Sequence, residues 1–146
     1  MSLKILRFAL AVSHSGCFEK QHFGDADKYL IYELNSRGWI FLHEKPNIYK
    51  DYDEDHRHGL PDKGLGVMKY LDSSGVHVLV SRQFGRNIRL VNQRFIPVVV
   101  HHTHPEQVLE ILQKHIRWIY DELSCRREAY RLFIVKKGFL KTRVSA

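Results

Sequence analysis

Two short and almost uninterrupted apolar runs constrain the fold of this chain most strongly. "VHVLV" covers residues 76–80 and "IPVVV" covers residues 96–100. Strands of this kind lie in sheets covered on both faces, usually parallel sheets with helical crossovers. Around these runs, apolar residues recur at helical spacing: Leu65, Met68, Leu71, and then Ile88, Val91 and Phe95. The pattern predicts a layered α/β domain.

The first third of the chain predicts an antiparallel meander. Residues 4–12, 28–34 and 39–43 alternate as strands, and Asn35, Ser36 and Gly38 supply a hairpin turn between the last two. In residues 28–34 both faces are apolar, which is typical of a strand buried on both sides. Residues 44–64 are polar, contain two prolines and show neither period. They predict a long loop.

A third helix follows the last apolar run. Thr103 and Glu106 have capping-box spacing around Pro105, and an apolar stripe follows at Val108, Ile111, Leu112, Ile116 and Ile119. The resulting order is three strands, helix, strand, helix, strand, helix. It predicts a mixed five-stranded sheet in which residues 4–12, 76–80 and 96–102 are parallel strands with helices packed on them.

Length and composition fit one soluble domain. The chain has 146 residues, 44% hydrophobic and 27% charged, and no apolar run of membrane-spanning length. Lys4 and Arg7 interrupt the apolar start, so we interpret it as a strand and not a signal peptide. Cys17 and Cys125 show no metal-site or disulfide spacing. We expect a cytoplasmic protein.

The positive charge is concentrated at the C-terminal end. Residues 124–146 hold seven basic residues and one acid, so they carry +6 of the net +7. Within them, "YRLFIVKKGFLKTRV" alternates around Lys136, Lys137 and Gly138, which predicts a hairpin docked on a sheet edge or a partner subunit. We therefore divide the chain into a domain over 1–120 and a basic extension over 121–146. The extension would attract an acidic partner protein or support a homodimer.

Polar segments follow each of the three predicted parallel strands. They are "SHSGC" at 13–17, "SRQFGRN" at 81–87 and "HHTH" at 101–104. The carboxyl ends of parallel strands meet at one edge of a sheet, which is the usual place for a ligand. The topology therefore predicts that these three segments converge.

Two blocks, in this order, carry a family resemblance. "HFGDADKYLIYEL" at 22–34 and "HGLPDKGLGVMKYLDSSGVHVLVSRQFGRNIRLVNQRFIPVVV" at 58–100 resemble the dinitrogenase iron-molybdenum cofactor biosynthesis family, which includes NifX/NafY-like proteins and the C-terminal domain of NifB. The likeness covers roughly residues 3–115. Gly85-Arg86-Asn87 replaces the usual Gly-Pro-Asn-Ala, and residues 51–64 are acidic and histidine-bearing where relatives are rich in glycine.

The resemblance implies an RNase H-like three-layer fold and a non-catalytic role. Such a protein binds or carries an iron–molybdenum or related iron–sulfur cluster, transiently, between a donor and an acceptor protein. His22 matches the family motif, and imidazole ligates iron or molybdenum or hydrogen-bonds a cluster sulfide. Cys17 is the nearest soft ligand. The alternatives are that His22 and Gly24 only shape a turn and that Cys17 is a small buried apolar group.

Further candidate ligands lie on the other loops. Gly85, with Ser81 and Asn87, predicts either an anion cradle or a simple turn capped by Ser81 or Asn87. His101 and His102 would point to opposite faces if the strand ran through both, so we select one, His101, as a partner for His22. We interpret His102 and His104 as surface residues or neighbours of the helix cap. His58 and His56 adjoin Asp51, Asp53, Glu54 and Asp55, a mixture that suits a divalent ion or a solvated loop.

Two other function classes are weighed against the carrier. A nuclease of RNase H-like fold needs several carboxylates around Mg²⁺, but residues 4–12 contain no acid and residues 28–34 contain only Glu33. Nucleic-acid or protein binding through the basic extension is the alternative that the charge supports. Loss of binding after removal of the extension would distinguish it from cluster binding.

Overall fold

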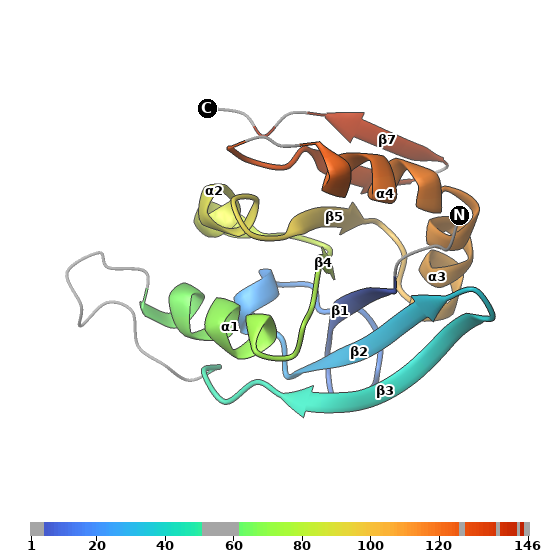
Figure 1. Ribbon diagram of the computed structural model, residues 1–146. Helices are drawn as coiled ribbons and strands as arrows, with labels where there is room; N and C mark the ends of the chain where they lie inside the picture. Colours follow the sequence, from blue (N-terminus) through green and yellow to red (C-terminus); the bar gives the residue numbers. More distant parts are fainter. Residues whose placement is uncertain (1–4, 51–61, 126–127, 137, 143, 145–146) are drawn as a thin grey trace.

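A seven-stranded mixed sheet forms the centre of the molecule (Figure 1). The computed structural model describes residues 5–50, 62–125, 128–136, 138–142 and 144. The strands are β1 (Leu6–Val12), β2 (Lys28–Asn35), β3 (Gly38–Pro46), β4 (Val78–Ser81), β5 (Ile96–Val100), β6 (Leu132–Val135) and β7 (Phe139–Thr142). Their spatial order is β3-β2-β1-β4-β5-β6-β7. The predicted mixed α/β sheet is confirmed, but the predicted number of five strands is wrong.

The strand pairing follows the predicted topology. β1 runs antiparallel to β2, and β2 antiparallel to β3, while β4 lies parallel to both β1 and β5. The pairs Phe8↔Val78 and Val78↔Ile96 set the register of the three parallel strands. The carboxyl ends of β1, β4 and β5 therefore face the same side of the molecule.

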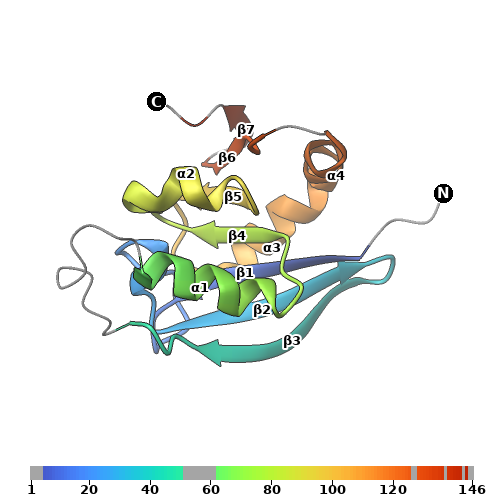
Figure 2. The ribbon, with the colours of Figure 1, turned by 60° about the vertical axis from the view of Figure 1, so that its left-hand side comes forward.

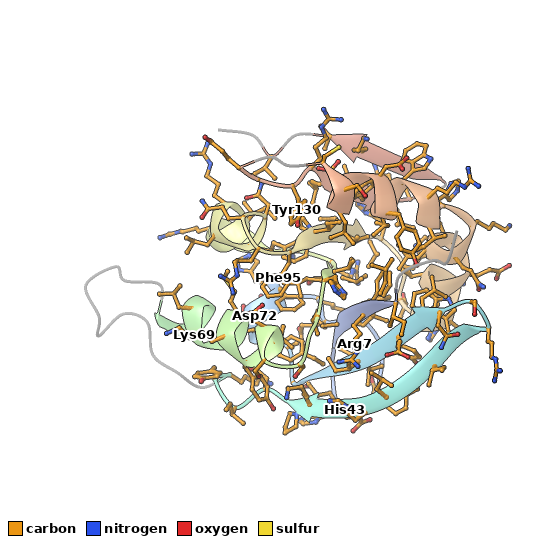
Figure 3. The ribbon with its side chains drawn as sticks, in the orientation of Figure 1. Arg7, His43, Lys69, Asp72, Phe95 and Tyr130 are labelled. Carbon is orange, nitrogen blue, oxygen red and sulfur yellow. The ribbon has the colours of Figure 1, made fainter. Side chains whose placement is uncertain are left out.

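Helices cover both faces of the sheet, as Figure 2 shows. The helices are α1 (Asp62–Asp72), α2 (Ile88–Val91), α3 (Pro105–Lys114) and α4 (Ile116–Ser124), with short 3-10 turns η1 (Phe23–Asp25) and η3 (Gly85–Asn87). On one face, Leu71 of α1 and the nearby Phe95 (Figure 3) pack with Tyr29. On the other face, Leu112 and Ile119 pack with Phe8. Successive side chains of β2 point alternately into the one core and the other.

Several predicted boundaries are corrected. The third helix is two helices, because the backbone turns at His115 (φ −111°, ψ 21°). Its N-cap is His104, with no side-chain capping bond, so the Thr103 capping box is wrong. β5 ends at Val100, so His101 and His102 lie beyond the strand and the alternation rule does not apply to them. β3 extends to Pro46, into the predicted loop 44–64.

The predicted C-terminal hairpin is confirmed. β6 and β7 pair antiparallel, and β6 lies parallel to β5 through Val98↔Phe133. The buried carboxylate of Glu122 accepts a hydrogen bond from the Arg131 backbone N–H at 2.8 Å. Tyr130 (Figure 3) donates its N–H to Asn92 O at 2.7 Å. The two extra strands thus continue the sheet beyond β5 and account for the higher strand number.

Candidate functional site

The three loops predicted to converge do meet at the carboxyl edge of the parallel strands. The Phe18 N–H donates to Thr103 O at 2.9 Å, which joins the loop after β1 to the loop after β5. The Phe23 N–H donates to Gln83 O at 2.8 Å, and Gln83 Nε2 donates to Lys20 O at 2.8 Å. Residues 17–23 therefore cross the sheet edge from the end of β5 to the end of β4.

His22 lies where this crossing segment meets the turn after β4. It is the N-cap residue of η1, its side chain is 52% exposed, and its Nδ1 lies 3.9 Å from Asp25 Oδ2. A Cβ atom built on Gly85 would lie 2.7 Å from His22 Nδ1. Gly85 also has a φ of +70°, which disfavours residues with a side chain. The imidazole therefore packs directly on the backbone of the "FGRN" turn.

Buried aromatic rings pack together beneath the surface at the His22 turn. Phe23 is buried and stacks on Tyr29 and Phe84, with ring centroids 4.8 and 5.5 Å apart. The Tyr29 hydroxyl donates to Phe23 O at 2.9 Å, and burial raises the pKa of this phenol. A cavity of about 30 Å³ under Gly24 is lined by apolar side chains including Phe84 and Met68. It has about the size of a water molecule, so this cavity is too small for a metal cluster.

Cys17 lies at the other end of the crossing segment. It is half-buried and closes a tight turn in which the Ser13 N–H donates to Cys17 O at 2.8 Å. Its Sγ is 3.8 Å from Nδ1 of His104. His101, which was predicted to join His22, is exposed at the end of β5, and its backbone N–H donates to Val135 O at 3.2 Å. The structure pairs the Cys17 thiol with His104, which the sequence analysis interpreted as a surface residue or a neighbour of the helix cap.

The other predicted site residues have different surroundings. Ser81 is fully buried and its hydroxyl donates to Gln83 O at 2.8 Å, a bond that stabilises the turn. The Gly24 carbonyl accepts a hydrogen bond from Asn47. Asn87 belongs to η3, but its side chain lies outside the description, as do His56 and His58 with the acidic residues around them.

Two residues that the sequence did not single out contribute to this edge. Asn47 follows β3 and donates to two carbonyls of the His22 turn. Asp27 accepts hydrogen bonds from the Lys50 ammonium and, at 2.8 Å, from the His14 N–H. The Lys50 hydrogen bond lowers the pKa of Asp27, and the His14 bond adds to this effect. Nothing in the polar run 44–64 marks Asn47, since the two carbonyls to which its Nδ2 donates lie more than 20 residues away.

The described residues at this edge offer few side-chain ligands to a single metal ion. Within the described ranges, no group of three or more His, Cys, Asp or Glu side chains is arranged to hold one. The described residues at this edge thus include one thiol–imidazole pair, Cys17 with His104, and a separate exposed imidazole, His22.

The comparisons with known proteins identify the family of the chain. The family model described as "Dinitrogenase iron-molybdenum cofactor" matches residues 4–117, which is more than three quarters of the chain. A search among curated proteins found no match. In the part of the chain that the structure describes, no helix is both long and apolar enough to span a membrane. The match includes β1 to β5 and both loops around His22, and the chain therefore belongs to the dinitrogenase iron-molybdenum cofactor family.

Proposed function

We propose that this protein is a non-catalytic carrier of an iron–molybdenum or related iron–sulfur cluster, with His22 as a direct contact to the cargo. The observation that supports it is the position of the imidazole, which is half exposed yet packed on the Gly85 backbone. A fixed and accessible imidazole ligates a cluster metal or donates to a sulfide. Its location on the surface favours release to an acceptor over permanent retention.

Cys17 and His104 form the second proposed contact with the cargo. Their donor atoms lie 3.8 Å apart at the end of β1 and the start of α3. A thiolate is the usual protein ligand of iron–sulfur cores. His101 and His58 stay candidate ligands, the first because it is exposed at the end of β5 and the second through its family motif.

The carboxylates on the sheet, and not the order of its strands, favour a carrier over a nuclease. The order β3-β2-β1-β4-β5, with the first three antiparallel, supports the RNase H-like fold. However, Glu33 on β2 accepts a hydrogen bond from Arg7 Nε at 3.2 Å, so its carboxylate is already engaged. Two-metal chemistry requires several free carboxylates at one point.

We further propose that the carrier works in the cytoplasm between a cluster donor and an acceptor protein. The basic extension over 121–146 offers a surface for an acidic partner, or for a second copy of the chain. Binding of nucleic acid through the same charges is the alternative, and it would show a steep dependence on salt concentration.

Anaerobic reconstitution tests the proposed carrier role. Purified protein is mixed with isolated iron–molybdenum cofactor or with a synthetic four-iron four-sulfur cluster, and the bound fraction is measured by metal analysis and visible absorption. His22→Ala should weaken binding by about tenfold or more, because it removes one coordination bond or one charge-assisted hydrogen bond to the cluster. His43→Ala, which removes an exposed imidazole on β3 (Figure 3), is the control. If the wild-type protein takes up neither cluster, the carrier role is refuted.

A further inference from the structure

Asn47 is buried at the start of the loop after β3, with 8% of its surface exposed. Its Nδ2 donates to Gly24 O at 2.8 Å and to Ala26 O at 2.9 Å. Its Oδ1 accepts the Tyr49 N–H at 3.0 Å, and its own N–H donates to Asp27 O at 3.1 Å. Two carbonyl partners on one side and an N–H on the other define the orientation of the amide.

These bonds determine the path of the backbone just after His22. The carbonyl of Phe23 accepts from the Tyr29 hydroxyl, and the carbonyls of Gly24 and Ala26 both accept from Asn47. The Asp25 N–H donates to His22 O at 2.9 Å and closes the turn. Thus a side chain from β2 and one from the end of β3 bind the inner side of the turn, while His22 lies on its outer side.

We propose that Asn47 is a positioning residue that holds the His22 turn in its cluster-binding conformation. The proposal rests on the carrier function, because His22 is the cargo contact there. Only an amide side chain of this length offers two N–H groups on one nitrogen to two carbonyls. Serine offers a single donor, and alanine offers none. Loss of both donors leaves two carbonyls without partners, which costs more than a typical hydrogen bond contributes.

Asn92 provides a matched control. It is also a buried asparagine, 5% exposed, and its Nδ2 donates to Tyr130 O at 3.0 Å. That bond attaches the C-terminal extension and involves no residue of the His22 turn. Asn92→Ala therefore removes a buried amide of the same kind and lowers stability without acting on the proposed site.

The experiment compares Asn47→Ala, Asn47→Ser and Asn92→Ala with the wild-type protein. Affinity for isolated iron–molybdenum cofactor is measured by anaerobic titration, and amide hydrogen exchange at Asp25 and Ala26 is measured without cargo. Asn47→Ala should bind about tenfold more weakly and exchange these amides about tenfold faster. Asn47→Ser should lie between it and the wild type, and it carries the test if the alanine variant does not fold. Asn92→Ala should bind within twofold of the wild type.

Two results would overturn the proposal while the carrier function stands, and a third test applies if the carrier function fails. Unchanged affinity in Asn47→Ala while His22→Ala binds weakly would show that the turn does not need the amide. An equal loss in Asn92→Ala would assign the effect to general stability. If the wild-type protein binds no cluster, the carrier function fails, and unchanged exchange at Asp25 and Ala26 would then refute the positioning role as well.

Discussion

Replacing Gly85 with alanine tests whether the close packing of His22 on the β4–η3 turn matters for stability and for cargo binding. The φ of +70° at Gly85 costs an alanine roughly 1–2 kcal/mol. The new Cβ would lie 2.7 Å from His22 Nδ1, so the imidazole must move or rotate away from its present position. Forcing a side chain off its rotamer adds about 0.5–1.5 kcal/mol. The total loss in unfolding free energy is then about 1.5–3.5 kcal/mol.

The matching shift in melting temperature follows from the length of the chain. An unfolding entropy of about 2.1 cal/mol/K per residue gives about 0.3 kcal/mol/K for 146 residues. Gly85→Ala should therefore lower Tm by about 5–12 °C in calorimetry. Gly16→Ala measures the backbone contribution alone, because its φ is +89° and no described residue has an atom within 4 Å of the added Cβ. It should lower Tm by about 3–7 °C.

A double-mutant cycle separates the contact with His22 from the backbone strain. In a His22→Ala background the imidazole is gone, so the cost of Gly85→Ala should fall to the value for Gly16→Ala. In the wild-type background, Gly85→Ala should also weaken cluster binding, because the displaced imidazole no longer has its present position. Equal costs in the two backgrounds would refute the contact between Gly85 and His22 as the reason for glycine at this position.

Three further predictions follow from the structure. His77 accepts the Arg7 N–H (Figure 3) at Nδ1, 3.1 Å away, and burial, with the Arg7 charge, lowers the pKa of His77. Because this folded pKa lies below the unfolded value of about 6.5, the free energy of unfolding should be full above that pH and fall as the pH drops below it. A melting series from pH 7.5 to 5.5 should show a smaller fall in His77→Gln than in the wild-type protein. Bound cluster should protect the Cys17 thiol, but not the exposed Cys125, from alkylation in a mass-spectrometric assay, and labelling of Cys17 that ignores the cluster would return it to a structural role. Phe133→Ala, in the buried core of β6, should cost about 3–5 kcal/mol in denaturant unfolding, whereas a loss below 1 kcal/mol would mean that the extension is not integral to the fold.

Local patterns of the sequence were sufficient to predict most of the elements. Tyr29 and Ile31 alternate with Leu30 and Leu34, and the structure places the two pairs in the two cores on opposite faces of the sheet. The hairpin after residue 130 was likewise predicted from alternation around one turn. Periodicity succeeds here because it follows from the backbone geometry of single elements, which neighbouring residues alone determine. The convergence of the three loops followed from topology, since parallel strands share one carboxyl edge.

Tertiary structure alone decided which side chains meet at that edge. The sequence did not show that Cys17 pairs with His104, because the end of β5 at Val100 decides which histidine reaches the thiol. It gave no sign that Asn47 binds the carbonyls of Gly24 and Ala26. These contacts depend on the paths of loops that are far apart in the chain. The path of a loop is set by long-range hydrogen bonds and packing and not by a local repeat, so the elements were predictable from the sequence but the contacts of the site were not.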